Sequence, residues 1–197
     1  MTTAPLRKDA ARNWHRIVEV GRRLVDEEVP IQLNDVARAA SVGVATVYRH
    51  FPTPEALVET VATPGLESLE QHAEQALAGD DAWLALRDFL YAAIDAQMTD
   101  ASLAPVFAAP QHALTRTAEL MRHLNELFAG ILDRARAAGV VNPSVTPADV
   151  GPLMCGLTFA ARVRSAAGDH APAVIARRYL DVLLEGLRVH EAGQPPS

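Results

Sequence analysis

The sequence of 197 residues has one cysteine, few aromatic residues and no long apolar run. The single Cys155 excludes an internal disulfide and is typical of a reducing compartment, and we interpret it as a small buried apolar residue. No apolar stretch approaches the ~20 residues of a membrane span, and no signal peptide is visible. These absences predict a soluble, cytoplasmic protein that does not associate with membranes.

The residue patterns of common catalytic and metal sites are also missing. The sequence has no His/Cys cluster, no glycine-rich phosphate loop and no Ser with a placed His and acid. His112 and His123 would lie about 16 Å apart along one helix, which is too far to share a metal ion. We therefore expect no enzyme activity, no metal and no cofactor.

Apolar residues make up 49% of the chain and aromatic residues only 5%, so the core is built mainly from Ala, Leu and Val. This composition favours closely packed helices over sheets. The net charge of −6 is unevenly distributed, because residues 1–62 are balanced and the remainder carries the whole excess of acid. Basic residues outnumber acidic ones within residues 1–23. This pattern suits a protein that contacts phosphate at one end only.

Apolar residues recur with helical spacing along most of the chain, and no strand pattern extends beyond a few residues. We predict an all-α protein of about nine helices. Residues 1–6 and the tail after Glu191 are predicted to be disordered, and 102–108 to be a short irregular piece that could act as a lid. The sequence Thr63-Pro64-Gly65 interrupts the pattern, so the predicted domains are 1–62 and 63–197. The predicted helices are 9–27, 34–40, 44–50, 53–62, 66–78, 82–98, 111–138, 147–167 and 172–190.

The stretch 32–51 contains two short apolar patterns on either side of a tight break. Ser41-Val42-Gly43 leaves room for a turn of only three residues, so the flanking helices must cross steeply, as in a helix-turn-helix. One predicted helix buries Val36, Ala37 and Ala40, and the other has Val44, Val47 and Phe51 on its apolar face. The outer face of the second helix suits entry into a DNA major groove; it carries Ala45, Thr46, Tyr48, Arg49 and His50.

The segment Val47-Tyr48-Arg49-His50-Phe51-Pro52-Thr53, followed by Glu55-Ala56-Leu57, resembles the end of the DNA-binding domain of the TetR (tetracycline-repressor-like) family. The resemblance covers roughly residues 9–62 and departs from the family at two positions. Ser41 stands where the family usually has Gly, so we expect a left-handed backbone at a residue with a side chain. Pro54 stands where the family usually has Lys or Arg, so one phosphate contact is missing.

The resemblance implies that Tyr48 and His50 clamp DNA phosphates. The alternatives are that Tyr48 packs under the first helix and that His50 is a core or capping imidazole. The methyl groups of Ala45 and Thr46 can pack on thymine, and Arg49 could bind guanine or phosphate. Asn34 either caps its helix or reaches a phosphate. The basic run near the start either contacts DNA or is a solvated charge run. The candidate DNA-binding residues are Arg7, Lys8, Asn34, Gly43, Val44, Ala45, Thr46, Tyr48, Arg49 and His50.

The resemblance also implies a second helical domain that binds a small apolar ligand and forms a homodimer. The predicted helices 147–167 and 172–190 carry more apolar residues than a two-helix edge needs, so a four-helix bundle across a two-fold axis would bury them. Burial within one chain is the alternative. The candidate ligand residues, which could equally be plain core, are Phe89, Gln97, Met98, Phe107, His112, Arg116, Met121, His123, Phe128, Phe159 and Arg162.

The leading hypothesis is a homodimeric, ligand-responsive transcriptional regulator, expected to be a repressor, that reads a palindromic operator in double-stranded DNA. The alternative is a helical small-molecule-binding or enzymatic protein whose helix-turn-helix has lost DNA affinity. Only Pro54 supports this alternative.

Overall fold

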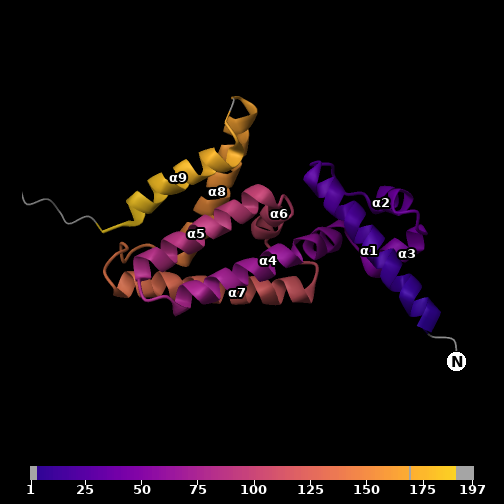
Figure 1. Ribbon diagram of the computed structural model, residues 1–197, viewed down its shortest axis with the longest axis horizontal. Coiled ribbons are helices and arrows are strands. Elements are labelled where there is room, and N and C mark those ends of the chain that lie inside the picture. Colours follow the sequence, from indigo (N-terminus) through magenta and orange to yellow (C-terminus); the bar gives the residue numbers. More distant parts are fainter. Residues whose placement is uncertain (1–3, 169, 190–197) are drawn as a thin grey trace, which may run out of the picture. The chain divides into compact units, whose positions relative to one another are not determined.

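A computed structural model describes residues 4–168 and 170–189, with side chains from residue 9 onward. Within these ranges the chain forms nine helices, and the only extended pairing is an isolated bridge between Val141 and Arg188 (Figure 1). The predicted all-α class is confirmed.

The first four helices are α1 (Ala4–Asp26), α2 (Leu33–Ala39), α3 (Val44–His50) and α4 (Pro54–Ala78). They are followed by α5 (Ala82–Thr99), α6 (Leu103–Ala108), α7 (Thr115–Ala137), α8 (Pro147–Ala166) and α9 (Pro172–Leu187). Helix α9 packs against both α5 and α8. At the start of α8, the hydroxyl and the amide of Thr146 both donate to the Asp149 carboxylate, and these bonds lower its pKa.

Contacts divide the chain into two compact units, which we call the first and the second unit. The first unit comprises Met1–Leu66 and Asp100–Glu119, and the second comprises Glu67–Thr99 and Leu120–Ser197. Helices α4 and α7 each contribute residues to both units.

The core of the first unit is built from α1, α2, α3 and the beginning of α4. Its buried side chains include Ile17, Val36, Val47, Phe51 and Leu57. Gly21 allows α1 to pack closely on α4, because a Cβ atom there would lie only 3.0 Å from the Leu57 side chain. Ala37 of α2 is also buried in this core, as predicted. Close packing in this core holds the short α3 in a fixed position and orientation.

The predicted break at residues 63–65 is wrong, because α4 continues through Pro64 as one helix. Buried residues on both sides of Pro64, such as Ala62 and Leu66, form one continuous apolar stripe that outweighs the cost of the proline. Gly65 allows a close approach, since a Cβ atom there would lie 3.1 Å from Asp100 and 3.2 Å from Leu103.

Other predictions also differ from the structure, since 103–108, predicted to be irregular, form the short helix α6, and the last predicted helix ends at Leu187. Helix α1 begins at Ala4, so the predicted disorder is wrong for residues 4–6, while residues 1–3 and the predicted tail after Glu191 lie outside the described residues. Helix α7 begins at Thr115 instead of residue 111. His112 therefore lies outside α7, and the predicted alignment of His112 with His123 on one helix is wrong.

Candidate nucleic-acid interface

The turn between α2 and α3 is closed by main-chain hydrogen bonds and contains one left-handed residue. The amide of Val42 donates to the carbonyl of Ala37 at 3.0 Å, and the amide of Ser41 donates to the carbonyl of Arg38 at 3.2 Å. Ser41 has φ = 52°, which confirms the predicted left-handed backbone. A side chain in this conformation costs about 1 kcal/mol, so the packing on either side must hold the turn in place.

Helix α3 spans Val44–His50, as predicted, and Gly43 is its N-cap. Val47 is its one fully buried side chain, whereas Ala45 and Arg49 are exposed and Tyr48 retains 47% of its accessible surface. Val44 is also exposed, so its predicted place on the apolar face is wrong, although its place among the DNA-binding candidates stays a prediction. Thr46 and His50 are half-buried. The helix thus presents most of its surface to solvent.

An open groove of about 400 Å³ lies beside Tyr48, at the beginnings of α2 and α4. Asn34, Thr53 and Pro54 are among its lining residues. The Thr53 hydroxyl accepts the amide of Ala56 at 3.2 Å and caps α4, as expected. Asn34 does not cap α2, because the N-cap is Gln32, which makes no side-chain capping bond. A phosphate contact by Asn34 therefore stays a prediction.

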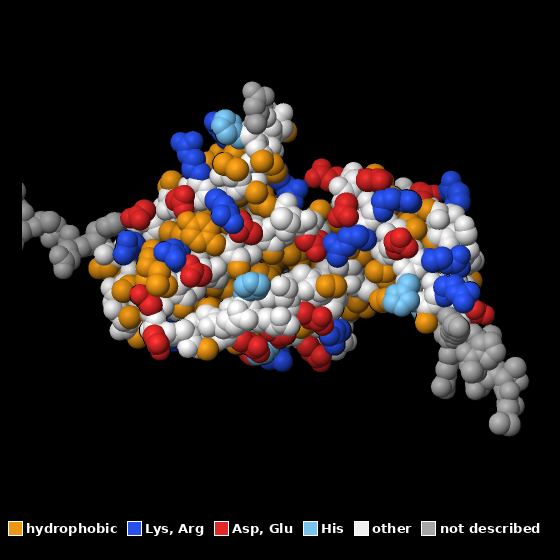
Figure 2. All heavy atoms as spheres, viewed as in Figure 1, with side chains coloured by type: hydrophobic (Ala, Val, Ile, Leu, Met, Phe, Trp, Pro, Cys, Tyr) orange, Lys and Arg blue, Asp and Glu red, His pale blue; other side chains and the backbone are white. Residues whose placement is uncertain are grey.

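The basic start of the chain is only partly described. Arg7 and Lys8 lie in α1, but their side chains are outside the described residues. Arg12 is exposed and lies 3.7 Å from Asp9, one turn away. Figure 2 shows Arg and His side chains over the end of the first unit at which α1 begins.

Glu59, which no sequence pattern marks, holds the segment before α7 against α4. Its side chain is 4% exposed, and its two carboxylate oxygens accept the amides of Ala113 at 2.6 Å and Leu114 at 2.8 Å. These bonds satisfy amides just ahead of α7 and explain why that helix starts late. The sequence gives no signal for this role, because the two amides lie more than fifty positions away.

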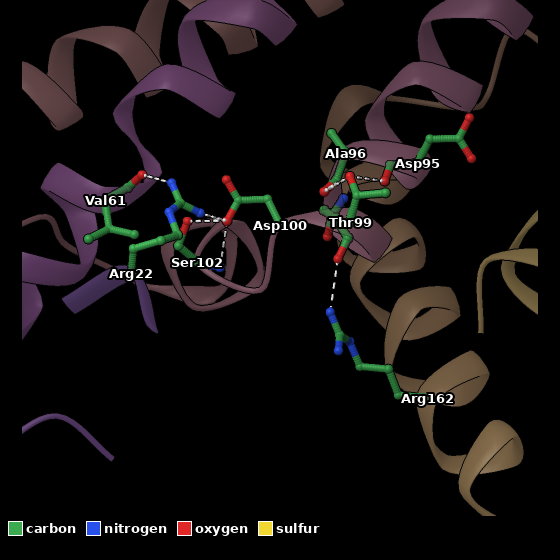
Figure 3. A network of polar contacts seen from close by, with 9 residues as sticks. Arg22, Val61, Asp95, Ala96, Thr99, Asp100, Ser102 and Arg162 are labelled. Carbon is green, nitrogen blue, oxygen red and sulfur yellow. Dashed lines mark hydrogen bonds and ion pairs between the residues drawn. The ribbon is translucent and has the colours of Figure 1, made fainter. Parts of the chain in front are cut away.

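Arg22 joins three segments of the first unit (Figure 3). Its guanidinium donates to the Asp100 carboxylate at 2.6 Å and to the carbonyl of Val61 in α4. The same Asp100 oxygen accepts the amide of Ser102 at 3.0 Å. The segment that begins at Asp100 is thereby fixed to α1 and α4.

Most of the predicted ligand residues lie in the second unit, where four are buried: Phe89, Gln97, Met121 and Phe128. The rings of Phe89 and Phe128 stack with centroids 5.7 Å apart. Gln97 is 3% exposed, and among the described residues its Oε1 has no hydrogen-bond partner. The guanidinium of Arg162 donates to the main-chain carbonyl of Gln97 at 2.9 Å.

The other predicted ligand residues are dispersed. Met98 is half-buried, and His123 forms a hydrogen bond with Glu70. Phe107, His112 and Arg116 belong to the first unit, so the predicted set is divided between the two units. Phe159 is 70% exposed and does not line an enclosed cavity within the described chain.

Large apolar side chains lie exposed along α8 and α9. We call these exposed residues of the two helices together the apolar face: Leu153, Phe159, Val163, Val174 and Val182. Hydrophobic side chains are visible near the turn that joins the two helices (Figure 2). A Cβ atom added to Gly151, Gly156 or Gly186 would meet nothing within 4 Å, so these glycines leave the helix surfaces open. Cys155 is half-buried, and burial raises the pKa of its thiol.

Within the described ranges, no group of three His, Cys, Asp or Glu side chains could hold a metal ion. No helix in the same ranges has the length and apolar character needed to cross a membrane.

Two family models match the chain. Residues 30–61 match the model for bacterial regulatory proteins of the tetR family, and residues 81–189 match the model for the C-terminal domain of SbtR-like transcriptional regulators. An HTH-type transcriptional regulator of Staphylococcus aureus (strain USA300) is 36% identical over 72 residues, which are 36% of this chain. The match spans only 39% of that relative's length.

Solved structures of similar fold include the TetR family transcriptional regulator PfmR from Thermus thermophilus. It is 26% identical with a TM-score of 0.61, and the match covers 88% of this chain and 100% of that one. The fold also resembles that of Thermus thermophilus FadR, a TetR family repressor solved with lauroyl-CoA (24% identity, TM-score 0.59, 93% and 99% covered). Together with the helix-turn-helix geometry, the two family-model matches establish that the chain belongs to the TetR family of transcriptional regulators.

Proposed function

We propose that the chain is a homodimeric, ligand-responsive repressor that binds a palindromic operator through two copies of α3. The observation that carries this proposal is the exposed surface of α3 around the single buried anchor Val47. A short helix held this way can enter a major groove, and the exposed Tyr48 and half-buried His50 can reach phosphates beside it.

The apolar face on α8 and α9 supports the homodimer. A side chain as large as Phe159, left 70% exposed beside exposed valines, is typical of a surface that another protein covers. In a two-fold dimer, α8 and α9 of both copies would pack as a four-helix bundle. This arrangement assigns Phe159 to the dimer interface in preference to the ligand site.

By function, we propose a division at residue 62, with DNA binding by residues 1–62 and ligand binding and dimerisation by residues 63–197. By contacts, Asp100–Glu119 belongs with the DNA-binding end, because Glu59 and Arg22 hold it there. A ligand that moves this segment would act directly on α1 and α4. To release DNA, the ligand must bind the conformation that does not fit DNA more tightly than the one that does. We expect the protein to act in the cytoplasm, where its operator is accessible.

We infer an apolar ligand in the second unit, with the buried Phe89 and Phe128 as apolar contacts and Gln97 as its polar anchor. The unpaired Oε1 of Gln97 offers an acceptor to a ligand hydroxyl or N–H group. The variant Gln97→Leu removes this unpaired acceptor, so we expect a thermal midpoint a few degrees higher for the ligand-free protein. Gln71→Leu is the matched control, since Gln71 is exposed in the same unit. A fall in the midpoint of Gln97→Leu would argue against this role.

Selection from a random DNA duplex library tests the function as a whole. We expect the purified full-length protein to enrich an inverted repeat whose half-sites lie about 34 Å apart, or a multiple of that distance. Binding should weaken steeply as salt is raised. If no sequence is enriched at low salt, the proposal is wrong and the non-DNA-binding alternative is favoured.

A further inference from the structure

We propose that Ala45 reads a thymine methyl group and Arg49 reads a guanine about two base pairs away in each operator half-site. This inference rests on the proposed function and deepens it, because it names the base sequence that α3 recognises.

The orientation of α3 follows from its one buried residue. Side chains on an α-helix are about 100° apart around the axis, so Ala45 and Arg49 each lie about 160° from Val47. Val47 is fully buried, and Ala45 and Arg49 are both exposed, as this geometry requires. They are therefore the two side chains that point most directly away from the protein and toward the base edges.

The remaining side chains fall on two flanks of α3. Val44 and Tyr48 lie on one flank, and Thr46 and His50 lie on the other. Tyr48 and His50 are about 160° apart around the axis, so they face opposite walls of a groove that contains α3. The flanks can thus contact the two phosphate backbones, while Ala45 and Arg49 remain for the bases.

The chemistry of the two central side chains determines the bases. Ala45 offers only a methyl group, which in the major groove matches the C5-methyl group of thymine. The polar edge of another base at this point would lose water without gaining a partner. Arg49 forms no ion pair within the described part of the chain, and its guanidinium can donate two bonds to O6 and N7 of guanine.

The spacing of the two bases follows from the spacing of the two residues. Ala45 and Arg49 are one turn apart, which is about 6 Å along the helix axis. Adjacent base pairs are stacked at about 3.4 Å. A helix lying along the groove therefore places its two contacts about two base pairs apart.

The operator obtained by selection gives the first test. We expect each half-site to contain a thymine and a guanine about two base pairs apart. An inverted repeat that lacks this pair would overturn the inference and leave the proposed function intact. A failure to enrich any sequence would overturn the proposed function as well.

A base analogue tests the methyl contact directly. Deoxyuridine in place of the critical thymine removes only the C5-methyl group, so we expect affinity to fall about fourfold for one half-site and about fifteenfold for both. Deoxyuridine in place of a thymine outside the half-sites is the control and should leave the affinity unchanged. Equal affinity of the wild-type protein for the thymidine and deoxyuridine duplexes would overturn the thymine contact.

Two variants assign the contacts to their residues. With Ala45→Gly, the thymidine and deoxyuridine duplexes should bind equally. A ratio still near fourfold per half-site would show that another side chain reads the methyl group. With Arg49→Ala, selection should lose its preference for guanine at one position of each half-site and keep the thymine. An unchanged preference for guanine would overturn the role of Arg49.

Discussion

Two exposed surfaces of this molecule differ sharply in chemistry. The outward surface of α3 combines a methyl group, a phenol ring, a guanidinium and an imidazole around one buried valine. The apolar face on α8 and α9 exposes Leu153, Phe159 and valines. Water solvates the first surface well and the second poorly, so the first suits a polar, charged partner and the second suits protein.

The two surfaces also differ in how they are supported. Helix α3 is only seven residues long and depends on the core of the first unit, whereas α8 and α9 are long helices that pack on each other and on α5. Variants that change one surface should therefore leave the other unchanged. Variants of each surface and of its support test this separation.

The largest expected effect comes from a charge placed on the apolar face. Val182 is 71% exposed, so Val182→Asp should not disturb the fold of one chain. In a two-fold dimer it would bury two unpaired carboxylates, which would cost on the order of 5 kcal/mol. We expect a monomer in sedimentation equilibrium, with operator binding lost. Val29→Asp is the control, because Val29 is an exposed valine of the first unit. A stable Val182→Asp dimer would show that the apolar face has another use.

The next effect concerns the support of the first unit. Glu59→Ala removes two charge-assisted hydrogen bonds and leaves the amides of Ala113 and Leu114 without these acceptors. We expect the free energy of unfolding of the first unit to fall by about 2 to 4 kcal/mol, measured by hydrogen exchange along α1 to α3. The dimer should persist. Glu55→Ala, at an exposed position of the same helix, should change the exchange rates little, and similar rates in both variants would contradict the role of Glu59.

A third, smaller effect separates phosphate contacts from base contacts. Tyr48→Ala should weaken binding to every duplex by about the same factor, roughly tenfold to thirtyfold, because a hydrogen bond to phosphate carries no sequence information. Fluorescence anisotropy on the operator and on single-base variants measures this. The dimer and the thermal midpoint should be unchanged, since Tyr48 is half exposed. A loss confined to some sequences would indicate that Tyr48 reads a base.

The smallest effect is expected in the turn. Ser41→Gly relieves the left-handed backbone at φ = 52°, and we expect the free energy of unfolding to rise by about 0.5 to 1 kcal/mol. Ser41→Val should lower it, because a branched side chain tolerates this conformation least. Chemical denaturation followed by circular dichroism measures both. A more stable valine variant would show that the turn is not strained.

The sequence predicts the helix-turn-helix well because its signals are local. The spacing of Val36, Ala37 and Val47, the three-residue turn and Pro52 fix its boundaries, and α3 is found where predicted. The resemblance to TetR proteins also predicts the left-handed backbone at Ser41, which the structure contains. The turn and α3 can therefore be predicted from the sequence without knowledge of any distant contact.

Features that depend on distant contacts could not be predicted. Pro64 interrupts the local pattern, but burial on both sides keeps α4 continuous. The late start of α7 depends on Glu59, which is distant in sequence. Phe159 is a predicted ligand residue, and its 70% exposure becomes apparent only from the packing of the helices. The roles of individual ligand residues stay predictions for the same reason.

The single anchor of α3 has a consequence for how this regulator can change. Since Val47 alone is fully buried there, the four exposed positions Val44, Ala45, Tyr48 and Arg49 can mutate with little cost to folding. A lineage could therefore acquire a new target sequence by a few substitutions without first gaining stability elsewhere. For the same reason, an engineer could retarget this protein by varying those positions while keeping Val47 fixed.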